Sequence, residues 1–501
     1  MLVEIIDVVL PIITLVILAL LTIPLFRIIR KTNNKTTLTL GWFIAVYAIA
    51  GATVANLALN YYSTPSPDIL NLGLNGSSSS MFSSAFMIDA ISIYMAIIIV
   101  AISAIVVIYT VFSVGTTDRP SERYFAIMLM TTAVLIGAVL AGDLLTFFIF
   151  WEAVTAGSAF LMLYKKNAFS LNATLKYLVM IIIASAFVVF GLSLIYGLTG
   201  TLNYLAVGQA LTTLTNNHVL IIAFIFLAAG YAIEAAIVPF HFWLPDAYTA
   251  APAPSAAFLS ALVDQGSYYI LIRVLVYIIS PATALNWTFM LAIMAALTMI
   301  VGNLFALIQN DVKRLIANIC VADVGYNLVA ITSVSSLGLI GNLYFFLIGG
   351  ITTALAFMAV GVINSHGFKT LDDFSGLGKK MPFVSLALVM AGLSFAGVPP
   401  FGGFLAKYLV FTAAIQANFS WLAVIGVLTS VLQTAYLFRL INVMYAKKPK
   451  DEAVIKESKR ILIPIFILVG VIIILGLYPQ IVFNLIEPVV KQLQLLGIVK
   501  V

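Results

Sequence analysis

The sequence is poor in charge, in cysteine and in histidine. Only 9% of its 501 residues are Asp, Glu, Lys or Arg, whereas about a quarter of an ordinary soluble domain is charged. A soluble chain of this length could not cover its surface with so few charges, which excludes a cytosolic enzyme, a nucleic-acid-binding protein and a secreted domain. The single cysteine, Cys320, excludes a disulfide within the chain and any CxxC motif, and the three histidines lie far apart. We therefore expect no cofactor and no bound metal.

The sequence is rich in apolar residues, and they form long uninterrupted runs. Apolar residues make up 63% of the chain and the mean hydropathy is +1.14, which predicts a polytopic membrane protein. Glu4 and Asp7 precede the first long apolar run, whereas a secretory signal begins with a basic segment and is shorter. We therefore expect the first apolar run to be a retained membrane helix.

Apolar stretches of about 20 residues predict an all-α membrane protein with fourteen spanning helices. The predicted spans are residues 5–29, 38–60, 85–113, 124–141, 143–164, 172–199, 219–238, 253–279, 286–308, 315–334, 338–364, 382–416, 420–446 and 460–478.

Lysine and arginine alternate along the chain in step with these helices. Most of the 25 basic residues lie in loops that follow odd-numbered predicted helices, or flank those loops, and the loops after even-numbered helices hold none. The positive-inside rule then places the basic loops in the cytoplasm and both termini outside. The net charge of +6 is therefore an orientation signal, and no nucleic-acid partner is needed to explain it.

Two of the predicted helices are interrupted. The first, 219–238, runs into Pro239-Phe240-His241 and is followed by an Ala-Pro-Ala-Pro run at 251–254, and the second, 382–416, contains Gly397-Val398-Pro399-Pro400-Phe401-Gly402-Gly403. Irregular backbone persists in a bilayer only inside protein or beside a hydrated cavity. The interruptions lie about five helices apart, as expected for two repeated halves. The alternative is a pair of ordinary proline kinks without function.

Several ionisable side chains are predicted to lie at membrane depth, where such groups are costly and by default functional. They are Asp143, Glu152, Glu234, Asp264, Arg273, Asp323 and Lys407. A low-dielectric environment favours the neutral form of a carboxyl or an amine, so these groups can exchange protons near neutral pH. For each one, a structural ion pair or a hydrogen-bonded packing role is the alternative. The set as a whole, with His241 as a lateral relay, predicts a proton or cation path.

Four segments resemble those of a known family. AIEAAIVPFHFWLPDAYTAAPAPSAAFLSALVDQGSYYILIRV, residues 232–274, resembles the central segment of antiporter-like subunits. These subunits occur in respiratory complex I, in Mrp-type multisubunit sodium/proton antiporters, and in related archaeal hydrogenase and sulfur-reducing membrane complexes. Residues 142–152, 310–326 and 397–411 resemble the fifth, tenth and twelfth helices of that family, and the similarity covers about residues 85–445.

The resemblance implies two inverted five-helix repeats, each with an interrupted helix and a half-channel. It divides the chain into helices one to three (1–113), a first repeat (114–280), a second repeat (281–446), and a cytoplasmic loop with helix fourteen and a short tail (447–501). It also implies the cell membrane of a prokaryote as the location.

The resemblance also implies roles for particular residues. Glu152 falls on the glutamate of the family's fifth helix, Lys407 on the lysine or glutamate of its twelfth, and His241 on the histidine that follows the first interruption. The chain departs from the family in having Glu234 and Asp264 at positions that usually carry lysine. Thr353 occupies our best estimate of a further lysine position, in the eleventh helix.

The predicted function is an antiporter-like, ion-translocating subunit of a multisubunit membrane complex, without a redox centre of its own. Its expected partners are other membrane subunits, the lipid bilayer, and H⁺ or Na⁺. The lysine-to-acid exchanges leave three outcomes open, namely a carboxyl-based proton path, a sodium-selective path and a non-conducting scaffold. A stand-alone transporter for a small solute and a quinone-site subunit are the rival interpretations.

Overall fold

The computed structural model describes residues 2–63, 68–71, 85–114, 119–212, 218–279, 287–449 and 455–495, and nearly all of them are helical. Within these ranges, twelve helices are long and apolar enough to cross a membrane. The two other predicted spans, 219–238 and 382–416, are the interrupted ones. The expectation of an all-α polytopic membrane protein is confirmed.

The spans follow the predicted order and their bounds shift by a few residues. The long helices are α1 (Leu2–Ile29), α2 (Lys35–Ser63), α3 (Ala90–Ser113), α4 (Arg119–Val139), α5 (Leu144–Met162), α6 (Ala168–Thr199), α12 (Trp287–Leu307), α13 (Val312–Thr332), α14 (Ser336–Ser365), α18 (Ser420–Ala446) and α19 (Lys459–Leu477).

Four elements lie outside the predicted set. A short antiparallel hairpin pairs β1 (Asp68–Asn71) with β2 (Ala85–Ile88), and α7 (Tyr204–Thr212) and α15 (Leu377–Lys380) are short connecting helices. The fourth is α20 (Gln480–Leu495), which packs against α3 and α14. The sequence predicted only a short tail after the last span, and the structure shows a helix of four turns there.

Polar residues placed just before the apolar runs begin several helices. The Asp89 carboxylate accepts a hydrogen bond from the Ser92 amide at the start of α3, and the Ser92 hydroxyl accepts one from the Asp89 amide. Asn167 and Ser170 form the same reciprocal pair at the start of α6. These capping boxes satisfy amides that a helix end would otherwise leave unpaired inside a bilayer.

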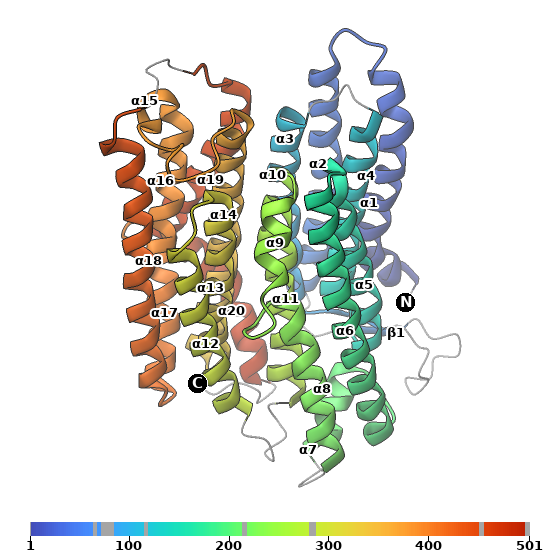
Figure 1. Ribbon diagram of the computed structural model, residues 1–501. Helices are drawn as coiled ribbons and strands as arrows, with labels where there is room; N and C mark the ends of the chain where they lie inside the picture. Colours follow the sequence, from blue (N-terminus) through green and yellow to red (C-terminus); the bar gives the residue numbers. More distant parts are fainter. Residues whose placement is uncertain are drawn as a thin grey trace.

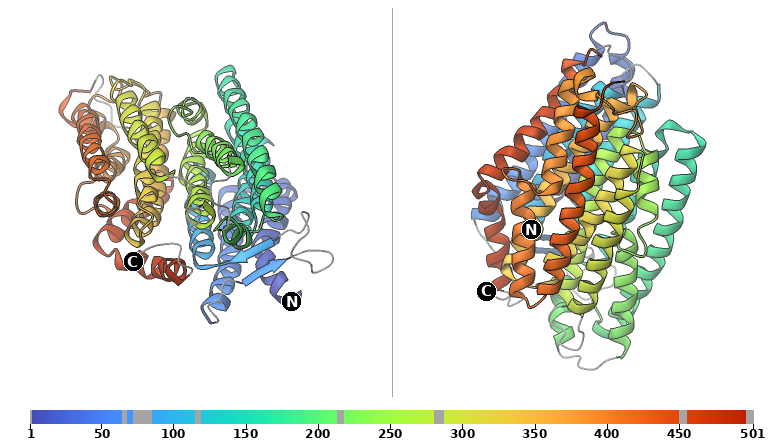
Figure 2. Two further views of the ribbon diagram at one scale, coloured as in Figure 1. Left: turned by 90° about the horizontal axis from the view of Figure 1, so that it is seen from below. Right: turned by 60° about the vertical axis from the view of Figure 1, so that its left-hand side comes forward.

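The two halves of the chain lie on opposite sides of the bundle. Figure 1 shows α1–α6 on one side, α12–α18 on the other, and α9–α11 between them, and the view from below in Figure 2 shows the same separation. The most buried spans are α13, in which the whole apolar window is buried, and residues 253–276. In contrast, only a third of the corresponding window is buried in α1, α2, α6 and α19. The bundle therefore presents its outer helices to lipid and encloses two central ones.

The eighth predicted span, 253–279, forms a helix of mixed geometry. Its α-helical parts, α10 (Ala253–Phe258) and α11 (Asp264–Leu271), alternate with the π-helical segments η2 (Leu259–Val263) and η3 (Ile272–Ile279). A π-helical segment adds a residue to the turn and is frequent at functional sites. Asp264 is the first residue after η2.

The first interruption separates α8 (His218–Glu234) from α9 (Trp243–Ala250). Its backbone groups find substitute partners, because the Thr298 hydroxyl accepts a hydrogen bond from the Val238 amide and Trp243 Nε1 donates one to the Ile233 carbonyl. Such substitutes are what allows irregular backbone at membrane depth.

The second interruption separates α16 (Pro382–Ala396) from α17 (Gly402–Gln416). Gly397 ends α16 with a φ of 74°, a conformation that glycine adopts without strain. A Cβ atom on Gly403 would overlap the Ser394 carbonyl oxygen, so glycine is required there for close packing. As at the first interruption, a side chain of the second half-helix donates a hydrogen bond to the first half-helix: Lys407 Nζ donates to the Phe395 carbonyl oxygen at 2.7 Å.

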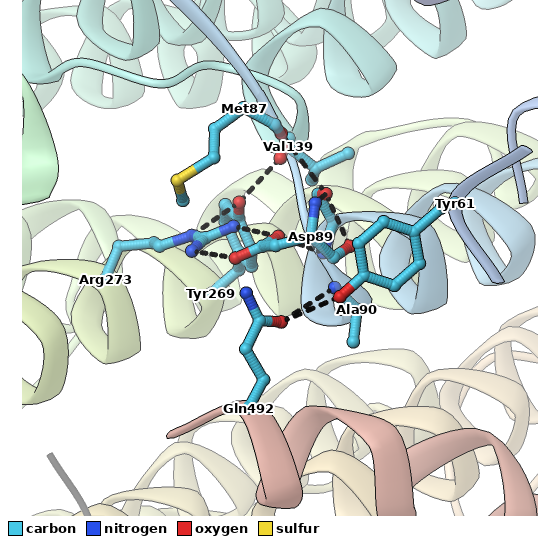
Figure 3. A network of polar contacts seen from close by, with 9 residues as sticks. Tyr61, Met87, Asp89, Ala90, Val139, Tyr269, Arg273 and Gln492 are labelled. Carbon is cyan, nitrogen blue, oxygen red and sulfur yellow. Dashed lines mark hydrogen bonds and ion pairs between the residues drawn. The ribbon is translucent and has the colours of Figure 1, made fainter. Parts of the chain in front are cut away.

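A fully buried ion pair fixes one end of the bundle (Figure 3). The Arg273 guanidinium donates two hydrogen bonds to the Asp89 carboxylate, at 2.6 and 2.7 Å, and a third to the Tyr269 hydroxyl. The Tyr269 hydroxyl in turn donates to the Val139 carbonyl. The pair thereby joins η3 to α3 and α4, which gives Arg273 a structural role.

The helix α20 is tied to the same end. The Gln492 side-chain oxygen accepts hydrogen bonds from the Ala90 amide, at 3.1 Å, and from the Tyr61 hydroxyl, at 3.3 Å. Its buried face therefore closes over the start of α3, next to Asp89.

We predict that Asp89→Asn lowers the free energy of unfolding by about 3–5 kcal/mol, because it leaves the Arg273 charge buried without its counter-ion. The measurement is the unfolding midpoint of the purified protein in detergent. The matched control is Glu487→Gln, which breaks an exposed pair with Lys491 and should cost no more than about 0.5 kcal/mol. If Asp89→Asn and Glu487→Gln lowered the free energy of unfolding equally, the structural role of the Asp89–Arg273 ion pair would be contradicted.

Candidate functional site

The first cavity of interest lies beside the first interruption and is named here the Glu234 cavity. It measures about 20 Å³, enough for a water molecule. Its lining comes from α5, α6, α8, α9, η2 and α11, and its residues are Trp151, Thr155, Ser158, Met162, Tyr177, Ile181, Glu234, Trp243, Tyr248, Leu259, Val263 and Asp264. Two carboxyl groups therefore face one small cavity.

Neither carboxyl of the Glu234 cavity has a cation beside it among the described residues. Glu234 and Asp264 are each 5% exposed. Both carboxyl oxygens of Glu234 and Oδ1 of Asp264 lack a hydrogen-bond partner within the described ranges, as does Nε1 of Trp151. An ionised carboxylate in such a place would be strongly disfavoured, so these groups are suited to holding protons.

Glu152 lies next to this cavity, and its side chain is half-buried on α5. The Ser185 hydroxyl of α6 donates a hydrogen bond of 2.5 Å to Glu152 Oε1. Its charge acts on Glu234, so the structure brings together Glu152, Glu234 and Asp264.

His241 lies within the first interruption and outside the lining of the Glu234 cavity. The side chain is buried and its ring stacks on Phe305, with 5.7 Å between ring centroids. Neither ring nitrogen has a hydrogen-bond partner among the residues that the structure describes.

The second cavity lies beside the second interruption and is named here the Lys407 cavity. It is smaller, about 10 Å³, and is lined by Asp323, Phe345, Ile348, Gly349, Thr352, Ser394, Phe395, Gly403, Ala406 and Lys407. Lys407 is 6% exposed. Besides the Phe395 carbonyl, its ammonium contacts Gln433 Oε1 at 2.6 Å and lies 4.5 Å from the centroid of the Tyr326 ring.

Asp323 supplies the negative charge of the Lys407 cavity. It projects from α13, it is 4% exposed, and its carboxyl interacts electrostatically with the Lys407 ammonium. This cavity therefore holds one acid and one base, whereas the Glu234 cavity holds two acids.

Asp143 lies apart from both cavities. It is the N-cap of α5, where it accepts hydrogen bonds from the Thr146 amide and hydroxyl and from the Ala85 amide of β2. Burial raises the pKa of the Asp143 carboxyl above its ordinary value, and these hydrogen bonds oppose that rise. Its contacts are those of a capping residue.

The helix α14 offers small residues where the family resemblance implied a histidine and a lysine. A Cβ atom on Gly350 would come within 2.9 Å of the Ala261 carbonyl oxygen, so α14 and η2 pack almost backbone to backbone. The Thr353 hydroxyl donates to the Gly350 carbonyl of its own helix, at 3.0 Å. In this chain α14 therefore contributes tight packing between the two cavities.

Basic residues of the predicted cytoplasmic loops hold the second half of the first interrupted helix. Lys176 and Arg314 contact the two carboxylate oxygens of Asp246 at 2.7 and 2.9 Å. Lys313 donates to the Thr249 and Ala251 carbonyls at the end of α9. A cation at a helix C-terminus is favourable, so these residues fix α9, which lines the Glu234 cavity.

Sequence reasoning missed the uncharged members of the two cavities. Gln433 and Tyr326 complete the surroundings of Lys407, and Tyr177 and Tyr248 line the Glu234 cavity. Gln433 could have been identified from the sequence, because it lies within the apolar run 420–446 and a buried amide needs a hydrogen-bond partner. The tyrosines could not, because aromatic residues are common throughout membrane helices. Among the described residues, no group of three or more His, Cys, Asp or Glu side chains is arranged to hold a metal ion.

The chain is similar to known proteins over most of its length. The family described as "NADH:quinone oxidoreductase/Mrp antiporter, TM" matches residues 141–433. The chain is 32% identical to F(420)H(2) dehydrogenase subunit N of Methanosarcina mazei over 448 residues, which cover 86% of this chain and 89% of the relative. It is also 32% identical to NADH-quinone oxidoreductase subunit N of Trichlorobacter lovleyi, over 75% of this chain and 78% of the relative.

Its fold is similar to that of a solved membrane complex subunit. A chain in the structure of the membrane-bound sulfane sulfur reductase, an archaeal respiratory membrane complex, superimposes with a TM-score of 0.84 at 28% identity, covering 96% of this chain and 97% of that one. The match spans the interrupted helices and both cavities. The chain belongs to the NADH:quinone oxidoreductase/Mrp antiporter transmembrane family.

Proposed function

We propose that this chain is a proton-translocating subunit of a redox-driven, multisubunit membrane complex in a prokaryote. The relatives are named as subunits of an F(420)H(2) dehydrogenase and of an NADH-quinone oxidoreductase, which supports other membrane subunits as partners. Electron transfer takes place in those partners, and this chain supplies the route for the ion. The observation that carries the proposal is the pair of small cavities, each beside an interrupted helix and each holding buried titratable groups.

The Glu234 cavity is suited to protons. Glu152 and Glu234 are neighbouring carboxyls, and two such groups do not both ionise at low cost in a low-dielectric site. The Glu234 oxygens make no hydrogen bond within the described ranges, although the Trp151 indole lies close to them, so a proton on that carboxyl lowers the cost of its burial. A proton arriving from Glu152 or leaving toward Asp264 changes the charge of the group by one unit, which is the elementary step of transport.

The Lys407 cavity can undergo the same one-unit change of charge, but its titratable groups are a lysine and an acid. The ammonium is held by one carbonyl, one amide oxygen and one aromatic face, and it has Asp323 as its counter-ion. The ionised pair has no net charge; protonation of Asp323 gives it a net charge of +1, and deprotonation of Lys407 gives it a net charge of −1. The proposal thus assigns transport roles to Glu152, Glu234, Asp264, Asp323 and Lys407, with His241 as a relay at the first interruption.

The orientation and the division into repeats are part of the proposal. The connection between α1 and α2 lies at the same end of the bundle as α15 (Figure 1), and both segments carry predicted cytoplasmic lysines or arginines. The positive-inside rule then supports termini on the outer face. Residues 114–280 and 281–446 each contain one interruption and one cavity, which supports two repeats.

We predict that Glu234→Gln lowers proton uptake per electron by about tenfold or more, because an amide cannot exchange the proton that the carboxyl carries. The measurement is dye-reported proton uptake by inverted membrane vesicles during turnover of the assembled complex. The matched control is the exposed Glu487→Gln, which should pump normally. Uptake that continues in sodium-free buffer in the unmodified complex supports the proton as the ion.

Normal pumping by Glu234→Gln in a fully assembled complex would refute a conducting role for the Glu234 cavity and favour the scaffold interpretation. A stable monomer that transports a solute in liposomes would contradict the subunit assignment.

We predict that Lys407→Met stops proton uptake and lowers the free energy of unfolding by about 3–5 kcal/mol, because Asp323 loses its counter-ion. Adding Asp323→Asn should restore much of the lost stability while uptake stays low, since the double variant has neither charge. The unfolding midpoint in detergent and the vesicle assay together check both parts. A double variant no more stable than Lys407→Met would show that the two side chains do not form a pair.

A further inference from the structure

The Glu234 cavity contains a hydrogen-bond donor and two acceptors that are not joined to each other. The indole Nε1–H of Trp151 has no acceptor among the described residues, and neither carboxyl oxygen of Glu234 has a hydrogen-bond partner there. Both residues line the same cavity, and the indole is near enough to act on the Glu234 carboxyl as a donor. An unpaired donor and an unpaired acceptor each cost free energy when they are buried, so the fold keeps these two side by side at a cost.

Most other donors in the lining of this cavity are already used. Hydrogen bonds to backbone carbonyls occupy the side-chain donors of Thr155, Ser158, Tyr177 and Trp243. The Tyr248 phenol lies within electrostatic range of Asp264. Tyr231, whose hydroxyl also lacks a partner within the described ranges, lines a different cavity, which α8, η3 and α12 surround. Of the donors that the structure describes in this lining, Trp151 is therefore the one that is both unused and beside Glu234.

The Trp151 indole is held in place from two sides. Its ring is buried and stacks on Phe147, one turn earlier in α5, with 5.5 Å between the ring centroids and 17° between the ring planes. On α11, a Cβ atom on Gly266 would lie 2.9 Å from Cζ3 of the indole, so glycine provides the room that the ring occupies. The donor is thus fixed before Glu234 changes its charge, and a preorganised donor stabilises a developing charge without having to reorient.

An indole N–H has the chemistry that a short-lived carboxylate requires. It only donates, so it pairs with the ionised form of Glu234 but cannot itself carry the transported proton. A hydrogen bond to a carboxylate is about twice as strong as one to a neutral acceptor, so the contact favours the ionised form. An ammonium group in the same place would hold the carboxylate ionised, whereas an indole stabilises it only in part.

The other titratable groups around Glu234 are acids and phenols. They are Glu152 on α5, Tyr177 on α6, Tyr231 on α8, Tyr248 on α9 and Asp264 on α11. No lysine, arginine or histidine is among the described lining residues. The positive end of the indole N–H dipole is therefore the stabilising group that a Glu234 carboxylate meets in this lining.

We propose that Trp151 is a positioning residue for Glu234, whose carboxylate receives a hydrogen bond from the indole N–H each time the carboxyl gives up its proton. This inference rests on the proposed function and names the group that makes the ionised state accessible. The O–H bond of neutral Glu234 breaks, and its proton bonds to a carboxylate oxygen of Asp264 or Glu152. The electron pair stays on Glu234, and the indole donates to that oxygen while keeping its own proton. Trp151 thereby sets the pH range over which Glu234 exchanges its proton.

The test follows Glu234 by the infrared carbonyl band of its protonated carboxyl, identified in the assembled complex as the band that Glu234→Gln removes. Without the indole donor the carboxylate is less stable, so Trp151→Phe should move the disappearance of this band to a pH higher by about one unit or more. Proton uptake per electron in inverted vesicles should fall about tenfold at neutral pH, because one pH unit is a tenfold change in the ionised fraction, and it should recover as the pH is raised.

Two further variants separate the N–H group from the shape of the ring. Benzothienylalanine at position 151 keeps the bicyclic shape but has sulfur in place of the N–H, so it should shift the band as Trp151→Phe does. Trp42→Phe is the structural control, because the Trp42 indole donates to the Thr22 hydroxyl at 3.0 Å, between α2 and α1. It should lower the unfolding midpoint in detergent and leave the pH at which the Glu234 band disappears unchanged.

Two results would overturn the inference. One is a Glu234 band that disappears at the same pH with and without the indole N–H while Glu234→Gln is inactive, which leaves the proposed function intact and makes Trp151 a packing residue. The other is a shift in Trp151→Phe that the benzothienylalanine complex does not share, because ring volume and not the N–H group would then be its cause. Normal proton uptake by Glu234→Gln would instead refute the proposed function itself.

Discussion

The constraint on which this structure depends is the cost of placing a charge or an unpaired backbone group in a low-dielectric interior. The fold meets that cost in three ways. Arg273 and Asp89 neutralise each other with a complete set of hydrogen bonds. At the interruptions, Trp243 and Lys407 donate to carbonyls that the broken helices leave free. In the Glu234 cavity no lysine, arginine or histidine is among the described lining residues, and under the proposed function protonation of the carboxyls avoids the cost.

The two cavities differ in the titratable groups that they bury. Under the proposed function, an ionised lysine–acid pair has no net charge until either partner exchanges a proton, and a neutral carboxyl of the Glu234 cavity gains a negative charge when its proton leaves. Of the two cavities, the one in the second half of the chain contains the lysine, Lys407.

The close packing of the centre limits how the halves communicate. Gly350 brings α14 onto η2, and the fully buried α13 fills the space beside them. The π-helical segments η2 and η3 lie on both sides of α11, so Asp264 directly follows irregular helix geometry.

Particular residues show how far the sequence could be interpreted without coordinates. The runs 420–446 and 338–364 predicted α18 and α14 almost residue for residue, because a bilayer imposes a fixed apolar length. A charge inside an apolar run is rare, so the sequence alone identified four candidate residues, Glu152, Glu234, Asp264 and Lys407. The proline and glycine runs likewise predicted both interruptions. Asp143 stood out for the same reason, yet its contacts are those of a helix cap.

What only the tertiary structure decided is which of these groups face one another. Nothing in the sequence said that Glu234 and Asp264 would line one cavity, or that Gln433 would complete the surroundings of Lys407. Hydropathy is a property of one helix at a time, so it determined the number, order and depth of the spans. Contacts between helices depend on the rotation and crossing of each against its neighbours, and those are set by the packing of all the spans together.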